Sequence, residues 1–226
     1  MKLRTLFAAL LWLVVTNAHG EMFVDRSIVI FEPGAQPRQD VEVSNTGDEV
    51  IYVQVEVLRV NSPGTPDEVR EKVDNPQDLK LLATPSKLII PPGSRKLVRI
   101  VNLQTSNDEE RVYRINVTPI VPPLQEESSQ LRIVVAYQIL TIVQPDDPAT
   151  NLAVTRDGRT IRFSNTGNTN VLLSDGQQCN GADDTCEDLP SRRLYAGNAW
   201  EQELPFDAPV SYSVRTFDGI KKEIFP

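Results

Sequence analysis

Histidine is almost absent from the 226-residue sequence, in which His19, close to the N-terminus, is the only one. The rest of the chain therefore cannot supply a Ser-His-Asp or Cys-His nucleophile or a histidine-ligated zinc site. A phosphate-binding loop is missing too, since segment 92–96 has one glycine and is typical of a turn. A secreted hydrolase is an alternative, and it would need a pair of catalytic carboxylates. No Asp or Glu pair stands out for this role from solvated acidic loops such as 108–110. We expect a protein that is not an enzyme and has no metal and no cofactor.

Basic residues are fewer than acidic ones: 23 Lys and Arg against 31 Asp and Glu give a net charge of −8 at pH 7. General nucleic-acid binding depends on neutralising phosphate groups with basic side chains. We therefore expect no nucleic-acid partner.

Long apolar runs are scarce, and the clearest one, Leu6–Val15, lies near the N-terminus. Lys2 and Arg4 precede it, and the small residues of Ala18-His19-Gly20 follow it. This order of charge, apolar core and cleavage site predicts a signal peptide over residues 1–20. The alternative is a membrane anchor, but the run has about half of the ~20 residues that a spanning helix needs. We therefore expect an exported chain that is not inserted in a membrane.

Cysteine occurs only twice, as Cys179 and Cys186, separated by a polar segment typical of a turn. In an oxidising compartment the pair is expected to form a local disulfide. Two free thiols or a metal pair are the alternatives, although no second cysteine pair or nearby histidine would complete a zinc site.

Short segments rich in Val, Ile, Leu and Tyr dominate the first half of the chain. Val53, Val55 and Val57, for example, alternate with Gln54 and Glu56, and this period of two indicates a strand with one buried face. Turn residues rich in Pro, Gly and Asn separate the segments. The predicted strands are Ser27–Phe31, Asp40–Ser44, Ile51–Val60, Lys87–Ile90, Lys96–Leu103, Val112–Ile120 and Leu131–Val143.

The second half repeats this pattern more weakly, and the tetrapeptide Ser-Asn-Thr-Gly occurs in both halves, at 44–47 and 164–167. A segment of prolines and acids at 144–148 marks the boundary between the halves. The sequence therefore predicts an all-β protein with two immunoglobulin-like β-sandwich domains in tandem, at 21–145 and 151–226. The second domain's predicted strands are Leu152–Val154, Thr160–Phe163, Val171–Leu173, Ser211–Thr216 and Lys221–Phe225.

The predicted strand Leu131–Val143 is unusually long and apolar for its place just before the boundary. It can be a central strand buried on both faces. It can also be an edge strand, and an exposed apolar edge invites pairing with another chain. The residues themselves leave both interpretations open.

The order of these signals resembles the PapD-like family of periplasmic pilus assembly chaperones, in particular its alternative or archaic branch. The resemblance covers nearly all of the chain after residue 20, with the stronger motifs in the first half. The segments that carry it are Phe23–Ser27, Val43–Gly47, Ile51–Val53, Ala83–Pro85, Pro92–Gly93, Val98–Ile100 and Tyr113–Val117.

This resemblance implies a periplasmic protein whose partners are pilus subunits (pilins) and an outer-membrane usher. In the family, the last strand of the first domain is lent to a pilin whose own sandwich lacks a strand, a case of the strand addition described for chaperone–pilin pairs. The alternating side chains that would fill the pilin groove are Leu131, Ile133, Val135 and Tyr137. An exposed donor strand also makes self-association of the free protein an expectation.

Two positions depart from the family pattern. Best-known members hold the pilin's terminal carboxylate with an Arg in the first strand and a Lys near the end of the donor strand. Those positions align with Ile28 and Leu140, neither of which is basic. Because a buried carboxylate needs a charged partner, other basic residues must take this role. The candidates are Arg26, Arg114 and, third, Arg99, which also resembles a structural ion-pair residue of the family.

The main rival hypothesis is a pilus subunit or adhesin with immunoglobulin-like domains. Such a protein would need an extended apolar donor segment ahead of its first strand, and the segment 21–27 is too short for that.

Overall fold

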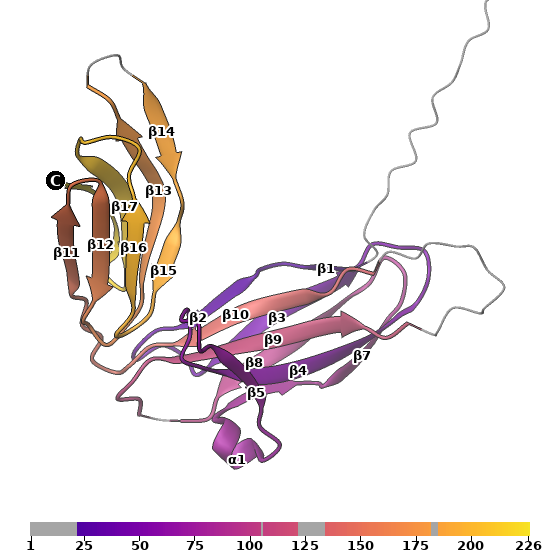
Figure 1. Cartoon of the computed structure of the whole chain (residues 1–226). Coiled ribbons are helices and arrows are strands. Elements are labelled where there is room, and N and C mark those ends of the chain that lie inside the picture. The colour runs from indigo at the N-terminus through magenta and orange to yellow at the C-terminus, as the bar shows by residue number, and fades with distance from the viewer. Residues whose placement is uncertain (1–21, 105, 122–133, 182–184) are drawn as a thin grey trace, which may run out of the picture.

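A computed structural model describes residues 22–104, 106–121, 134–181 and 185–226 of the chain. They form two β-sandwiches, one after the other along the sequence, whose long axes meet at a steep angle (Figure 1). The only helix in these residues is one turn long, α1 (Pro76–Leu79). The predicted all-β class with two immunoglobulin-like domains is confirmed.

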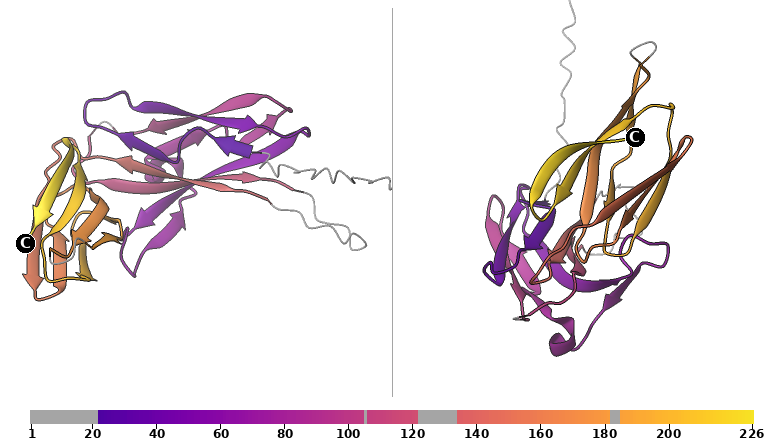
Figure 2. Two further views of the ribbon diagram at one scale, coloured as in Figure 1. Left: turned by 90° about the horizontal axis from the view of Figure 1, so that it is seen from above. Right: turned by 90° about the vertical axis from the view of Figure 1, so that its left-hand side faces the viewer.

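The first sandwich is built from two sheets that face each other (Figure 2). In the first sheet the order is β1 (Met22–Val24), β3 (Arg38–Asn45), β8 (Arg95–Asn102) and β6 (Leu81–Thr84). In the second the order is β2 (Ile28–Phe31), β10 (Tyr137–Val143), β9 (Arg111–Pro119), β4 (Ile51–Asn61) and β5 (Val69–Lys72), and β7 (Lys87–Ile90) also pairs with β4.

Period-two alternation produces the core of this sandwich. Tyr113, Ile115 and Val117 of β9 are fully buried, whereas Arg114 and Asn116 between them point to the outer face of the sheet. β4 follows the same rule with Val53, Val55 and Val57, which all pack in the same cluster. The second sheet therefore has an apolar inner face and an outer face on which polar and apolar side chains are mixed.

The second sandwich has a three-stranded sheet opposite a larger one. The first contains β11 (Leu152–Asp157), β12 (Thr160–Asn165) and β16 (Ala199–Glu203). The second contains β14 (Cys186–Leu189), β13 (Val171–Cys179), β17 (Val210–Thr216) and β18 (Gly219–Phe225), and β15 (Arg192–Leu194) also pairs with β13. Aromatic side chains pack together in the core of this sandwich. The ring of Phe163 contacts those of Trp200, Tyr212 and Phe225, with centroids 5.7, 5.6 and 5.2 Å apart.

The repeated tetrapeptide makes the same turn in both domains. The Asn45 side chain donates to the carbonyls of Glu49 and Ile90 at 2.6 and 2.9 Å and accepts from the Gly47 amide. Asn165 donates to the carbonyls of Thr169 and Leu194 and accepts from the Gly167 amide. Both asparagines are 1% exposed, so each supplies hydrogen-bond partners to buried backbone groups at the equivalent turn of its domain.

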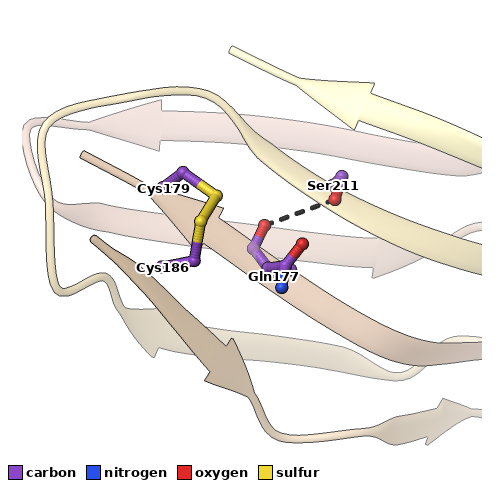
Figure 3. Close-up of a disulfide and its surroundings, with 4 residues drawn as sticks. All are labelled: Gln177, Cys179, Cys186 and Ser211. Carbon is purple, nitrogen blue, oxygen red and sulfur yellow. Dashed lines mark hydrogen bonds between the residues drawn. A yellow bond between two sulfur atoms is a disulfide. The ribbon is translucent and has the colours of Figure 1, made fainter. Parts of the chain in front are cut away.

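The cysteine pair forms a disulfide that joins β13 to β14. Cys179 and Cys186 stand directly opposite each other in the ladder, with Cα atoms 4.0 Å apart (Figure 3). Two residues before Cys179, the Gln177 carbonyl accepts a hydrogen bond from the Ser211 hydroxyl of β17 at 3.4 Å (Figure 3). This end of the second sandwich lies far from the first sandwich (Figure 1).

One predicted strand differs in length. Leu131–Val143 was expected to be a single long strand, but among the described residues β10 begins at Tyr137, and residues 134–136 are not in a strand. β10 pairs with β9 with Tyr137 opposite Val117, so two further steps would place Val135 opposite Pro119. Proline has no amide hydrogen to donate, and β9 ends there, so the ladder stops.

Several elements have little sequence signal and were not predicted. β5 is exposed along its whole length, and β15 has only three residues, so neither shows a repeating apolar face. β1, β6, β14, β16 and α1 were missed in the same way.

Candidate functional site

β10 has an open edge at its N-terminal end. It pairs with β9 over all seven of its residues but with β2 only from Leu140 to Val143. In the described part of the chain, Tyr137–Ile139 therefore have a partner strand on one side only. Segment 134–136, which pairs with no strand among the described residues, continues this edge, and Val134 and Val135 are 42% and 40% exposed. Exposed apolar residues beside an open strand edge are a template for another strand.

The predicted groove-filling residues have different environments. Val135 is exposed. Tyr137 is half-buried against the core of the first sandwich, and its hydroxyl donates to the Met22 carbonyl at 3.0 Å. Leu131 and Ile133 lie outside the described residues. The role of all four stays a prediction.

The two positions that are basic in the best-known family members lie side by side here. Ile28 of β2 is the register partner of Leu140 of β10. Leu140 is 8% exposed and Ile28 is 44% exposed. Leu140 is also the register partner of Arg114 on β9, so an arginine of the next strand flanks this apolar pair.

Arg114 has an unusual environment for an arginine. It is partly buried on the outer face of the sheet, between Leu58 of β4 and Leu140 of β10. Its Nε atom is buried and has no hydrogen-bond partner, and in the described part of the chain its guanidinium forms no ion pair. Unpaired, partly desolvated donors are costly, which makes this side chain available to an anion.

The other two candidate arginines are already paired. Arg99 donates to Asp40 through Nε and an Nη at 2.9 and 3.0 Å, on the opposite sheet of the sandwich. This bond is the first cause that lowers the pKa of Asp40. Arg26 donates to its neighbour Asp25 at 2.9 and 2.7 Å. The structure does not bring Arg99 together with Arg114.

The outer face around Arg114 meets the second sandwich. Val60, Val112, Leu140 and Ile142 form an apolar cluster with Tyr195, which follows β15. The β4–β5 turn also contributes: the Pro63 carbonyl accepts from Asn198 at 2.9 Å. Gly64 has a positive φ of 74°, and a Cβ there would lie 2.8 Å from the Asn198 side chain and 3.0 Å from the Tyr195 ring, so glycine suits this close approach.

Residues 108–110 were interpreted from the sequence as a solvated acidic loop, and for Glu110 this interpretation is wrong. One of its carboxylate oxygens accepts hydrogen bonds from the Thr169 hydroxyl at 2.7 Å and from the Asn170 amide and side chain at 2.9 and 2.6 Å. Glu110 precedes β9 of the first sandwich, whereas Thr169 and Asn170 belong to the second. No local sequence pattern indicates this role, because the partners lie about sixty residues away.

Burial dominates the electrostatics of this junction. It lowers the pKa of Arg193 on β15, whose guanidinium donates to Asn170, and it raises the pKa of Tyr195. Glu68, in the loop before β5, behaves differently: burial alone would raise its pKa, but the hydrogen bonds from the Gly64 amide and Arg70 outweigh that effect and lower it.

No group of three or more metal-binding side chains occurs within the residues that the structure describes. Across the same residues, no helix is long and apolar enough to cross a membrane.

A comparison with protein families decides the identity. Residues 21–149 match the model of the pili and flagellar-assembly chaperones, PapD N-terminal domain. The chain belongs to this chaperone family. The resemblance predicted from the sequence is confirmed, and the protein is a chaperone of pilus assembly rather than a pilus subunit.

Curated relatives of this chaperone come from Escherichia coli. It is 25% identical to a protein named as a CFA/I fimbrial subunit over 195 residues, 81% of each chain. It is 27% identical to one named as a CS1 fimbrial subunit over 174 residues, 71% of this chain and 72% of the relative. Although both relatives carry the name of fimbrial subunits, the family match is to the chaperones.

Solved structures show the same fold. The class 5 fimbriae chaperone CfaA superposes with a TM-score of 0.66 at 20% identity, covering 91% of this chaperone and 99% of CfaA. The CsuC–CsuE complex of the archaic Csu pili of Acinetobacter baumannii contains a chain that gives a TM-score of 0.60 at 14% identity, covering 90% and 96%. Both likenesses are of the fold, and they include chaperones of the class 5 and the archaic pili.

Proposed function

We propose that this chaperone acts in the periplasm, where it binds and caps pilus subunits by lending them the open edge of β10 and the residues before it, and delivers them to an outer-membrane usher. Leu131, Ile133, Val135 and Tyr137 supply the alternating side chains for the pilin groove. Residues 1–20 act as the signal peptide, and the two domains span 21–145 and 151–226.

One observation carries the proposal: residues 134–136, which lead into β10, are exposed and pair with no strand of the described structure. Val134–Ala136 are all exposed, and β2 pairs only with the last four residues of β10. A pilin that lacks a strand has the complementary defect, an apolar groove with unpaired backbone groups. Burying large apolar side chains there contributes roughly 1.5–3 kcal/mol each before ordering costs.

Arg114 is the proposed contact for the pilin's terminal carboxylate. It lies beside Leu140, next to the positions that are basic in the best-known members, and has no partner of its own in the described structure. From Leu140 to Val135 an extended chain covers about 17 Å at ~3.3 Å per residue. A pilin strand held by its carboxylate at Arg114 can thus run along β10 toward Val135.

The same open edge supports self-association of the free chaperone. A second copy would cover the exposed residues when no pilin is present.

The test is a pair of neighbouring substitutions, Val135→Asp and Val134→Asp. Both residues are exposed to nearly the same extent, 40% and 42%, so both variants are expected to fold. By period two, only Val135 shares the parity of Leu131, Ile133 and Tyr137. Val135→Asp should therefore reduce by at least tenfold the amount of pilin that co-purifies from the periplasm, as should Ile133→Asp.

Val134→Asp is the matched control and should retain most of the pilin. Equal capture by the two variants would contradict the donor-strand assignment. If the unsubstituted chaperone captures no pilin from its own bacterium, the proposed function itself is wrong.

A further inference from the structure

The last strand of the second domain has one free edge. β18, drawn in yellow in Figure 2, ends its sheet, and β17 is its only partner within the described structure. The two strands pair over all seven residues of β18, Gly219–Phe225. The opposite edge therefore offers about 24 Å of regular strand at ~3.4 Å per residue. A free edge of this length is a template for pairing with a further strand.

Two large apolar side chains of β18 are exposed to water. Ile220 and Ile224 are 58% and 72% exposed. Their register partners on β17 are Arg215 and Ser211, which lie on the outer face of the sheet, since the β17 residues that alternate with them are buried. Packing of the domain's own core therefore does not explain an isoleucine at either position.

The sequence of β18 is complementary to its own reverse. In antiparallel pairing about a two-fold axis at Lys222, Ile220 of one copy lies opposite Ile224 of the other, and Lys221 lies opposite Glu223. Side chains that lie opposite each other share one face of a sheet, so the isoleucines meet on the outer face and the charged pairs on the other. The strand thus offers two apolar pairs and two ion pairs to a second copy of itself.

The neighbouring registers lack this complementarity. An axis at Lys221 sets Ile220 opposite Lys222, and an axis at Glu223 sets Lys222 opposite Ile224. An axis between two residues would set outer-face side chains opposite inner-face ones, because side chains alternate along a strand. Of these registers, only the axis at Lys222 pairs apolar with apolar and acid with base.

The two lysines of β18 make its edge selective. Lysine on an edge strand discourages pairing with other chains. An acid opposite Lys221 offsets this effect, and Glu223 of a second copy is that acid. Lys222 lies opposite itself on the axis, where like charges weaken the pairing. One strand from each copy also buries less than the ~1,200 Å² of a standard stable interface, so we expect a weak and reversible contact.

We propose that β18 pairs antiparallel with β18 of a second copy of this chain, which forms a dimer whose second domains share one continuous sheet. This interface does not depend on the proposed function and differs from the open edge of β10, which belongs to the first domain. The edge of β10 stays free in this dimer, so each copy keeps its own pilin-binding edge.

Sedimentation velocity of the purified chaperone over a concentration series measures the dimer. Lys221→Glu sets two glutamates opposite each other twice in the interface and should raise the dissociation constant at least tenfold, as should Glu223→Lys. The double variant with both changes has the net charge of the unsubstituted chain and should bring the constant back to within about twofold. Both residues are exposed, so all three variants are expected to fold.

The position of the axis has a separate test. Lys222→Cys sets two cysteines opposite each other, with Cα atoms ~4.5–5.5 Å apart, which is within the range of a disulfide. Lys221→Cys is the matched control, because its side chain faces Glu223 of the other copy. Under mild oxidation, Lys222→Cys should form a disulfide-linked dimer and Lys221→Cys little of it.

A chaperone that stays monomeric at every concentration would overturn the proposed interface. A dissociation constant that Lys221→Glu leaves unchanged would do the same, and so would a double variant no better than the single ones or equal cross-linking at positions 221 and 222. A dimer that is lost in Val135→Asp but kept in Lys221→Glu would also contradict it, because self-association would then occur through β10.

Discussion

At the scale of single residues, the two buried asparagines of the repeated tetrapeptide show how a polar side chain stabilises a sandwich. Asn45 and Asn165 each connect three backbone groups, two carbonyls and one amide. Burying the asparagine side chains without these hydrogen bonds would be costly. The same hydrogen bonds would contribute less in an exposed position, where water competes for the polar groups. The repeat therefore has a structural role and does not belong to the binding site.

Asn45→Ala should lower the free energy of unfolding by about 3 kcal/mol, because two carbonyls and one amide lose their partner. Urea denaturation followed by fluorescence measures this change. Asn61→Ala is the control, since Asn61 is exposed and donates only to the exposed Glu71; its effect should stay within about 0.5 kcal/mol. Similar small effects in both variants would show that the corner is not important for stability.

At the scale of elements, some strand edges are paired with a neighbouring strand and others are not. The ladder between β9 and β10 stops where β9 ends at Pro119, so residues 137–143 pair with β9 whereas the described residues before them, 134–136, are exposed and in no strand. The β13–β14 hairpin is the opposite case. Its ladder runs to the cysteine pair, where the disulfide joins the two strands, far from the junction.

Removal of the disulfide with Cys179→Ser and Cys186→Ser should destabilise the second domain by about 2 kcal/mol, a modest effect because the loop that it closes is short. Pilin capture should stay unchanged, since the hairpin lies at the far end of the domain (Figure 1). Urea denaturation with and without a reductant checks the first point, and co-purification checks the second. A loss of pilin comparable to that in Val135→Asp would contradict it.

At the scale of the whole molecule, the angle between the domains depends on a small set of contacts. Glu110 accepts three hydrogen bonds from the second domain. Tyr195 adds apolar contact, and the β4–β5 turn accepts from Arg192 at 3.2 Å and from Asn198. These contacts keep Arg114 of the first domain near Arg193 of the second.

Glu110→Ala should loosen the junction without unfolding either domain, because three donors lose an acceptor at a cost of about 1–3 kcal/mol. Hydrogen exchange of the Asn170 amide should become faster, and small-angle scattering should show a wider range of inter-domain angles. Glu109→Ala, which alters the exposed neighbouring carboxylate, should leave exchange and scattering unchanged; if Glu110→Ala does the same, Glu110 does not hold the domains.

The sequence alone determined the class of fold, and it also indicated the strand that we propose for pilin binding. Period-two patterns such as Val53, Val55 and Val57 are local, so they can be read without knowing what each strand pairs with. Tertiary structure decided the rest. Only the register between β9 and β10 places Arg114 beside Leu140, and only the contact between domains brings it near Arg193 and gives Glu110 its partners. Register and domain contacts join residues far apart in the chain, and for this reason no local pattern reveals them.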